Sequence, residues 1–387
     1  MNDYLKFKYK TRIIYGMNGA VIYDLEQKRM FSVEILESKI LKELEYGARI
    51  EDLYDVYTPG IVDEFCEKLI RAGVAVLYDT FVPRETCRAG TKVLSQKFIP
   101  YTLQRCFIEL PFPCALDCDH CRSPKLFGCF SCSVAESVTS IDFSFYKNIF
   151  QQIFDFNCQE IYLYGGNPLA HWGETRELIN YIRRVSSCKI YLLFAYQELD
   201  PSILTFIAKQ SVIPVLNVNW PFVPETFNKK WIYNFNVAYA DFPKFKSYCT
   251  NLNDLGVKYF SGIYSGEEKI KIDYIAEGFM QDMDTLLFEV MDIMHPCLCG
   301  QLAIKANKKI YVCKNMHEPI GDLTKADLTK IFSLNPVIMQ SWSSATAAIC
   351  PNCKYRKSCL NCRAFNENNP QNSEVSCIHS DQCTGKG

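Results

Sequence analysis

Three cysteines, Cys114, Cys118 and Cys121, stand within eight residues in the stretch PFPCALDCDHCRSP. Thiolates are soft anionic ligands that bind zinc and iron–sulfur clusters. A structural zinc ion takes four protein ligands, so this stretch would need a further ligand from elsewhere. A four-iron cluster bound by three thiolates would instead keep one iron open. Either use requires a loop that wraps a metal site.

The cysteine content of the whole chain points the same way, because 20 of the 387 residues are cysteine. Such a content would suggest disulfides in a secreted protein, but the first residues, MNDYLKFKYKTRIIYGMNG, contain no apolar core of an export signal. We therefore expect a cytoplasmic protein in which thiols serve metal or redox chemistry.

Charge and hydropathy exclude other classes of function. The formal net charge of −1 argues against a general electrostatic grip on nucleic acid or on an anionic membrane. No stretch approaches the roughly 18 continuous apolar residues of a membrane span. With 48% hydrophobic residues, the chain can bury a sizeable core.

Residues 1–88 are predicted to form a small winged-helix-like domain. Short β-branched and aromatic runs broken by Asn18-Gly19 predict strands. Helical periodicity follows, with apolar faces at Val33, Leu36, Ile40 and Leu44 and then at Val62, Phe65 and Leu69, and the run VAVLYD predicts a closing strand.

This pattern resembles the peptide-recognition domain of enzymes that modify ribosomally made peptides. The resemblance implies that a leader peptide binds as an added strand at an exposed sheet edge. The alternative is a DNA-binding winged helix. Its recognition helix would carry Asp63, Glu64 and Glu67, which oppose phosphate contact.

Residues 100–285 alternate strand-like and helical runs, which predicts an α/β fold with a parallel sheet, a partial (β/α)6 TIM-like barrel. The cysteine stretch follows the first predicted strand, and GGNP (Gly165, Gly166, Asn167 and Pro168) follows the second. Since the carboxyl ends of parallel strands meet at one edge, we expect both motifs at the same mouth.

The spacing C-x3-C-x2-C after a strand, together with YGGNPLA, resembles the radical SAM superfamily. The resemblance implies that Cys114, Cys118 and Cys121 hold a 4Fe-4S cluster whose open iron binds S-adenosyl-L-methionine, cleaved to a 5′-deoxyadenosyl radical. GGNP would bind the methionyl ammonium, with Asn167 in place of the usual glutamate. His120 stands where the family usually has an aromatic residue and would pack near the adenine.

Residues 290–387 are expected to have little regular structure and to fold around metal. The run C-x2-C-x5-C-x2-C resembles the SPASM extension of radical SAM peptide maturases, although Asn307 and Lys308 stand where glycine is common. The resemblance implies one or two auxiliary 4Fe-4S clusters; two zinc sites are the alternative. One cluster would use Cys299, possibly with Cys297, and Cys313 and Cys362. The other would use Cys350, Cys353 and Cys359 with Cys377 or Cys383.

These features favour an oxidoreductase that modifies, and by preference cross-links, a ribosomal precursor peptide bound through its leader. The resemblance also implies an electron donor such as flavodoxin or ferredoxin. Three alternatives stay open: a catalytically silent peptide-binding partner, a formylglycine-type sulfatase maturase and a zinc-stabilised regulator. Cys129 and Cys132 have no assigned role: they could complete a zinc set, form a redox pair or lie near the substrate.

Overall fold

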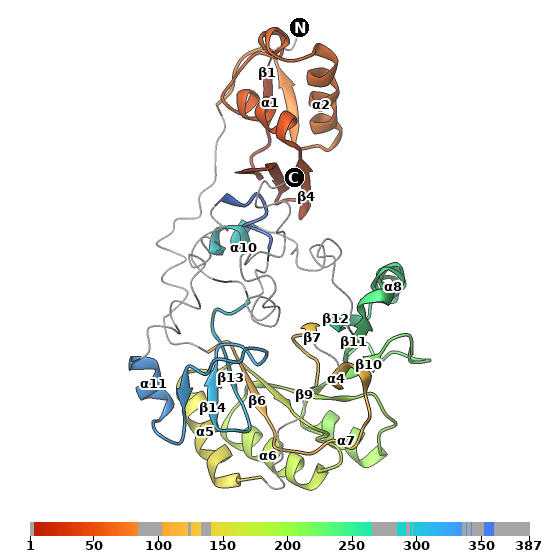
Figure 1. The fold of residues 1–387 in the computed structure, drawn as a ribbon, viewed down its shortest axis with the longest axis vertical. Helices are drawn as coiled ribbons and strands as arrows, with labels where there is room; N and C mark the ends of the chain where they lie inside the picture. Colours follow the sequence, from red (N-terminus) through yellow and green to blue (C-terminus); the bar gives the residue numbers. More distant parts are fainter. Residues whose placement is uncertain are drawn as a thin grey trace.

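The structure consists of two regions of regular secondary structure, with a short connecting region between them (Figure 1). An N-terminal unit, residues 4–83, lies at one end, and a large α/β sheet lies at the other. Helix α10 (Thr285–Val290) and residues 352–359 lie between them. The computed structural model describes residues 4–83, 103–122, 125–132, 141–264, 285–291, 295, 297–334, 338, 342 and 352–359.

The N-terminal unit contains two small antiparallel sheets and three helical segments. Strands β2, β3 and β4 form one sheet with β3 in the centre, and β1 pairs with β5 in the other. The short helical segment between the two predicted helices is a 3-10 helix, and β1 was not predicted. The elements are β1 (Tyr4–Phe7), β2 (Thr11–Gly16), β3 (Gly19–Asp24), β4 (Arg29–Val33), α1 (Ile35–Glu45), η1 (Glu51–Asp55), α2 (Pro59–Arg71) and β5 (Ala75–Tyr78).

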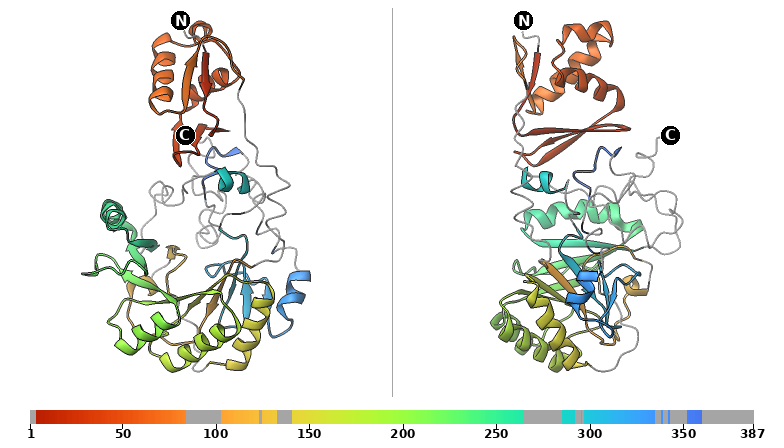
Figure 2. Two further views of the ribbon diagram at one scale, coloured as in Figure 1. Left: turned by 180° about the vertical axis from the view of Figure 1, so that it is seen from behind. Right: turned by 90° about the vertical axis from the view of Figure 1, so that its left-hand side faces the viewer.

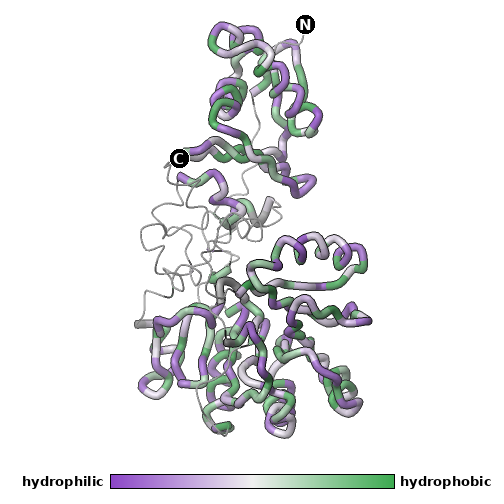
Figure 3. The backbone as a smooth tube through the Cα atoms, turned by 45° about the vertical axis from the view of Figure 1, so that its right-hand side comes forward, coloured by the Kyte–Doolittle hydropathy of each residue, from purple (hydrophilic) through white to green (hydrophobic). Residues whose placement is uncertain are grey.

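Helices α1 and α2 are amphipathic, with hydrophobic and hydrophilic residues alternating along them (Figure 3). Val62, Phe65 and Leu69 of α2 are buried, as their spacing predicts. In α1 the prediction is wrong at Leu36, which is 45% exposed. The helix begins at Ile35, so Leu36 belongs to its first turn, and Ile40, Leu41 and Leu44 form the buried face instead.

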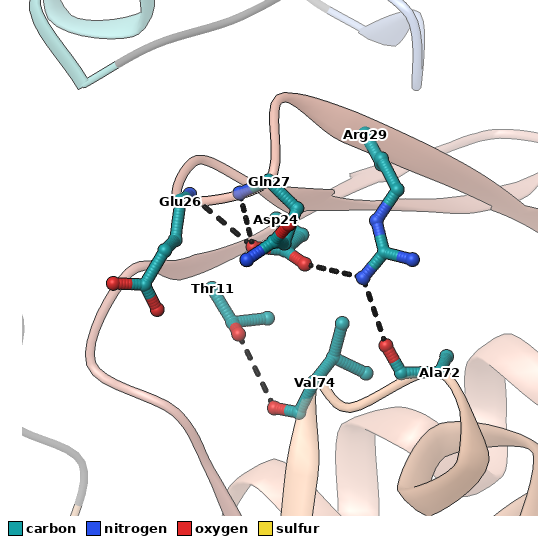
Figure 4. Close-up of polar contacts among 7 residues, drawn as sticks. All are labelled: Thr11, Asp24, Glu26, Gln27, Arg29, Ala72 and Val74. Carbon is teal, nitrogen blue, oxygen red and sulfur yellow. Dashed lines mark hydrogen bonds and ion pairs between the residues drawn. The ribbon is translucent and has the colours of Figure 1, made fainter.

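Asp24, at the end of β3, ties the three-stranded sheet together (Figure 4). Its carboxylate accepts hydrogen bonds from the backbone N–H groups of Glu26 (3.2 Å) and Gln27 (3.1 Å) and from Arg29 (2.9 Å). Arg29 also donates to the carbonyl of Ala72, 3.2 Å away. The turn between β3 and β4 is therefore fixed to the end of α2.

The second region is a ten-stranded sheet in the order β15-β14-β13-β6-β8-β9-β10-β11-β12-β7. Strands β6 to β12, apart from β7, run parallel, and the sheet stays open between edges β15 and β7. Strand β11 was not among the predicted segments. The strands are β6 (Arg105–Glu109), β7 (Lys125–Phe127), β8 (Glu160–Tyr164), β9 (Lys189–Ala195), β10 (Val212–Asn219), β11 (Ile232–Ala238), β12 (Lys258–Tyr264), β13 (Gln301–Ile304), β14 (Lys309–Tyr311) and β15 (Gly321–Asp322).

Helices α5, α6 and α7 cover the face of this sheet that points away from the N-terminal unit (Figure 2). Their apolar sides, with that of α8, pack into the main hydrophobic core. A second, smaller core of mostly aromatic residues occupies the opposite face of the sheet. The helices here are α4 (Asp119–Arg122), α5 (Phe143–Asp155), α6 (Trp172–Val185), α7 (Pro201–Lys209), η2 (Tyr239–Asp241), α8 (Phe242–Asp254) and α11 (Leu328–Leu334).

The expectation of little regular structure after residue 290 is wrong for residues 301–334. Strand β13 pairs parallel with β6, and β14 pairs antiparallel with β13, so this segment extends the main sheet. Leu302, Ile304 and Ile310 are buried in the main core. No helix among the described residues is long and apolar enough to span a membrane.

We predict that Asp24→Asn destabilises the N-terminal unit by about 1–3 kcal/mol at neutral pH, because hydrogen bonds to a charged group are lost. Partial burial opposes ionisation, but the hydrogen bonds from Arg29, Gln27 and Glu26 outweigh it and lower the pKa of Asp24. The stabilisation is therefore present above the ordinary carboxyl pKa and is lost as the pH falls through the lowered value.

Pulse proteolysis of the full chain in urea, with cleavage inside residues 4–83 detected by mass spectrometry, measures the stability of the N-terminal unit. Acidification below about pH 4 should narrow the difference between the wild type and Asp24→Asn. Glu26→Gln is the control, because in the described part of the chain the Glu26 carboxylate is paired with exposed Lys10, 3.5 Å away. Equal stability of Asp24→Asn and Glu26→Gln would contradict the prediction.

Candidate cofactor and metal site

The cysteine loop and the GGNP turn lie side by side at one edge of the sheet. Strands β6 and β8 pair in parallel, with Glu109 opposite Tyr164 at their carboxyl ends. Beyond these ends, the N–H of Leu110 donates to the carbonyl of Tyr164 (2.6 Å), and the N–H of Asn167 donates to that of Pro113 (3.3 Å). The two loops therefore meet where the strand order predicts.

The three cysteines of the loop are all partly exposed. Residues 110–118 have no regular structure, and α4 then makes a single turn. The N–H of Cys121 donates to the carbonyl of Cys118 (2.9 Å), which folds the second and third cysteines of the loop towards each other. Cys114 lies directly after the segment that touches the GGNP turn.

Gly165 and Gly166 have φ values of +110° and +54°, where side chains are disfavoured. A Cβ on Gly166 would lie 1.9 Å from the carbonyl oxygen of Phe112, and one on Gly165 would lie 2.5 Å from that of Leu110. These close approaches involve the backbone that leads into Cys114. These glycines position the cysteine loop against the end of β8.

The side chain of Asn167 has a local partner, because its Oδ1 accepts a hydrogen bond from the N–H of Leu169 (3.2 Å). The next residue, Pro168, accepts through its carbonyl from the hydroxyl of Thr175 (2.8 Å). These contacts fix the turn to the start of α6. An ammonium ligand at Asn167 would share an oxygen that already has one donor.

His120, expected near the adenine, is only 2% exposed. Its Nδ1 lies 2.6 Å from Oδ1 of Asn219, the last residue of β10. This contact fixes α4 and the cysteine loop to the end of a strand on the far side of the parallel sheet. The imidazole therefore links the two halves of the site edge.

A buried amide cluster lies on β10 and β11, where Asn217 stands opposite Asn234 and Asn219 opposite Asn236. Asn217 Oδ1 accepts from the side-chain amides of Asn234 (2.9 Å) and Asn236 (3.2 Å). Ser131 donates to Asn236 Oδ1 (2.8 Å). Asn234 and Asn236 were not predicted as site residues, although their alternation in IYNFNVA repeats that of Asn217 and Asn219 in LNVN.

The hydrogen bonds of this cluster are incomplete. Among the described residues, Nδ2 of Asn217 and Oδ1 of Asn234 are buried without a protein partner, as is the hydroxyl of Tyr164 nearer the cysteine loop. A buried polar atom without a partner costs roughly 1–3 kcal/mol. One donor and one acceptor on neighbouring amides form a pair that a bound ligand or water can satisfy.

Deeper on the same face, aromatic rings stack on one another. Phe107 and Tyr162 lie 4.6 Å apart between ring centroids, and Tyr162 and Tyr191 lie 4.3 Å apart. Burial, and then the charge of Glu160, raises the pKa of the Tyr162 phenol, so this hydroxyl stays protonated. The face is thus polar at the carboxyl edge of the strands and apolar towards their start.

Cys129 lies against the predicted first auxiliary site. Its thiol forms a hydrogen bond with the thiol of Cys297. This hydrogen bond, together with burial, raises the pKa of Cys297 well above its usual value. Burial, and then Cys297, raises the pKa of Cys313 to about 11. Lys314 donates to the carbonyl of Ser131 (2.6 Å), so the segment after β7 lies along the residues that follow β14.

The other predicted auxiliary ligands are only partly described. Burial raises the pKa of the half-buried Cys299 thiol to about 11, with Arg105 opposing. Cys353 and Cys359 are both buried in the 352–359 turn. Cys350, Cys362, Cys377 and Cys383 lie outside the described residues.

The three thiols of the cysteine loop are a donor set that a four-iron cluster with one open iron can use. A tetrahedral zinc ion with bonds of about 2.3 Å would draw its sulfur ligands to within roughly 4 Å of one another. A four-iron cluster spreads its thiolates over separate irons. Cys129, a candidate to complete a zinc set, contacts Cys297 instead.

Comparison with known proteins finds similarity of fold only. No family model and no curated protein sequence matches the chain. A crystal structure of SuiB from Streptococcus suis is 12% identical with a TM-score of 0.44, over 93% of this chain and 96% of that one. A crystal structure of the same protein bound to precursor peptide SuiA is 12% identical with a TM-score of 0.42, over 98% of this chain and 100% of that one.

A third structure, native anSMEcpe with bound AdoMet, is 12% identical with a TM-score of 0.47, over 68% of this chain and 91% of that chain. The course of the backbone is thus similar, at low identity, to that of these solved structures. At these identities and TM-scores the similarity concerns the course of the backbone and not the chemistry.

We predict that Gly166→Ala destabilises the α/β sheet region by about 2–4 kcal/mol, because a side chain at positive φ would also collide with the carbonyl of Phe112. Thermal or urea unfolding, followed by tryptophan fluorescence, measures the loss. Gly173→Ala is the matched control, since a Cβ there meets no atom within 4 Å. Equal stability of the two variants would contradict the close approach.

Proposed function

We propose that this chain is a radical SAM enzyme that oxidatively modifies, by preference cross-links, a ribosomally made precursor peptide. The observation that carries the proposal is the meeting of two motifs at one sheet edge. The loop of Cys114, Cys118 and Cys121 follows β6, and the Gly165–Pro168 turn follows the adjacent β8. Three thiolates leave one iron of a cluster open, and the glycine turn lies beside them.

When bound, a reduced 4Fe-4S cluster with S-adenosyl-L-methionine supplies a 5′-deoxyadenosyl radical that removes a hydrogen atom from the substrate. In our proposal Cys114, Cys118 and Cys121 hold the cluster, and Gly165–Pro168 with His120 hold S-adenosyl-L-methionine. The protein must also orient the target C–H bond and exclude water. The stacked aromatic residues of the sheet support this role, because they close the deeper part of the face to solvent.

We further propose one or two auxiliary clusters. Cys297 or Cys299, with Cys313 and Cys362, would hold one, and the burial of Cys313 beside Cys297 supports this set. Cys350, Cys353 and Cys359, with Cys377 or Cys383, would hold the other. A donor such as flavodoxin or ferredoxin would supply electrons to the clusters.

The N-terminal unit would bind the leader of the peptide as an added strand. In the sheet order β2-β3-β4, only β2 and β4 are edges. The end of β2 already meets residues 352–356, because Met17 N–H donates to the carbonyl of Asn352 (3.1 Å) and Arg356 donates to that of Tyr15 (2.9 Å). The contacts of β4 with the same residues are made by the side chain of Ser32. We therefore assign the peptide to the edge of β4, where backbone groups can pair with it.

A catalytically silent peptide-binding partner is the second candidate. It is favoured by Asn167, which lacks the charge of the usual glutamate and whose oxygen already accepts from Leu169. The complete cysteine triplet favours the enzyme. The two candidates differ in one measurable step, the cleavage of S-adenosyl-L-methionine.

We predict that the protein, reconstituted anaerobically with iron and sulfide and reduced with dithionite, converts S-adenosyl-L-methionine to 5′-deoxyadenosine. Replacing Cys114, Cys118 and Cys121 together by alanine should reduce this product to background, because the open iron is lost. Quantifying 5′-deoxyadenosine by chromatography, alongside bound iron and sulfide, measures both effects.

Cys249→Ala is the control for thiol loss, since Cys249 lies on α8 outside the proposed ligand sets. It should form product at the wild-type rate. Bound iron without product, also with a candidate peptide present, would favour the silent partner. Zinc in place of iron at the triplet would contradict both candidates.

A further inference from the structure

The central strand of the N-terminal sheet is buried on both faces. Ala20 and Ile22 of β3 belong to the core of the N-terminal unit. Val21 and Tyr23, on the opposite face, are both fully buried in a separate cluster with Phe288 and Met291. The second face of this strand is therefore covered by a segment more than 260 residues further along the chain.

The 352–359 turn covers the neighbouring part of the same face (Figure 1). Besides the two bonds to the end of β2, the backbones approach so closely that a Cβ on Gly16 would lie 2.4 Å from the backbone nitrogen of Lys354. No other residue type fits at Gly16 without moving the turn. The contact thus joins one defined backbone surface to another.

Side chains add specific bonds across this contact. The hydroxyl of Tyr23 lies 3.1 Å from that of Ser358. Ser32 of β4 accepts from Lys354 (3.0 Å) and Tyr355 (3.1 Å). Strands β2, β3 and β4 therefore each contact the turn, and β4 is the strand whose edge we assign to the peptide.

The same turn carries the described cysteines of the second predicted metal site. The hydroxyl of Tyr23 meets a neighbour of each cysteine, because it lies 3.5 Å from the carbonyl oxygen of Lys354, next to Cys353, and 3.1 Å from the hydroxyl of Ser358, next to Cys359. The turn also holds two buried cations, Lys354 (7% exposed) and Lys357 (4% exposed). They donate to Ser32 and to the carbonyl of Phe288, and their charges would also favour metal-bound thiolates on the same turn.

We propose that metal bound by Cys353 and Cys359 holds the N-terminal unit in place, with Tyr23 as a positioning residue of that metal site. The inference rests on the proposed use of these cysteines as ligands, but not on radical chemistry. Bound metal would fix the conformation of the 352–359 turn, and the sheet of β2, β3 and β4 packs against this turn. Coupling of this kind is reciprocal, so seating of the sheet also favours metal binding.

Hydrogen–deuterium exchange of the full chain tests the first half of the proposal. The protein is reconstituted with iron and sulfide, and the double variant Cys353→Ser, Cys359→Ser is compared with the wild type. Exchange in β2 and β3 should rise about tenfold or more in the variant, while β9 and β10 exchange as in the wild type. Unchanged hydrogen–deuterium exchange in β2 and β3, or an equal rise of exchange in β9 and β10, would overturn the proposal.

The triple variant of Cys114, Cys118 and Cys121 separates this proposal from the proposed enzyme activity. It removes the radical cluster and should leave exchange in β2 and β3 as in the wild type. A rise there equal to that of the double variant would overturn the assignment to the 352–359 turn. Loss of 5′-deoxyadenosine in the triple variant bears only on the proposed function.

Release of iron to an added chelator tests the role of Tyr23. Tyr23→Phe keeps the ring against Phe288 and removes the hydroxyl bonded to Ser358. It should speed loss of one class of bound iron about tenfold, as expected for a residue that supports metal ligands. Tyr54→Phe, which loses a hydroxyl bond to Asp63 in the same unit, is the matched control. Equal release from the two variants would overturn the positioning role.

Discussion

In a parallel pair of strands, the residues that follow each strand leave the sheet at the same edge. For β6 and β8, this puts the cysteine loop and the GGNP turn side by side without further specification. The two loops also pack closely against each other, because Gly165 and Gly166 have no Cβ to separate their backbone from that of the cysteine loop. His120 then ties the loop to Asn219, so three strand ends hold one short cysteine-bearing segment.

Much of this arrangement could be predicted from local patterns. Cysteine spacing, glycine pairs and helical periodicity are local signals, and they located the site edge and both helices α1 and α2. Short strands that depend on distant partners were missed. Strand β1 pairs with β5 about 70 residues later, and β13 with the still more distant β6. Strand β11 follows β10 without a helix between them, so the expected alternation gave no signal.

Contacts between distant segments also explain what could not be predicted of the site. Cys129 has no motif, and only the fold brings it to Cys297. The turn before Cys313 shows the converse, because its conformation departs from what its residue type favours. Lys308 adopts φ +61°, a conformation that glycine supplies more easily. Its ammonium meets Asp142 at 2.9 Å, a contact that a glycine could not make. The turn is thus formed without a glycine at this position.

The distribution of polarity over the sheet face separates a supporting part from a binding part. Near the start of the strands, aromatic rings stack on one another and so bury their apolar surfaces. Towards the carboxyl edge, Asn217, Asn234 and Tyr164 bury polar atoms that the described chain leaves without partners. An apolar residue at each position would avoid that cost. The cost is incurred where three strands end beside the cysteine loop, and there a bound ligand or water can complete the hydrogen bonds of the amide cluster.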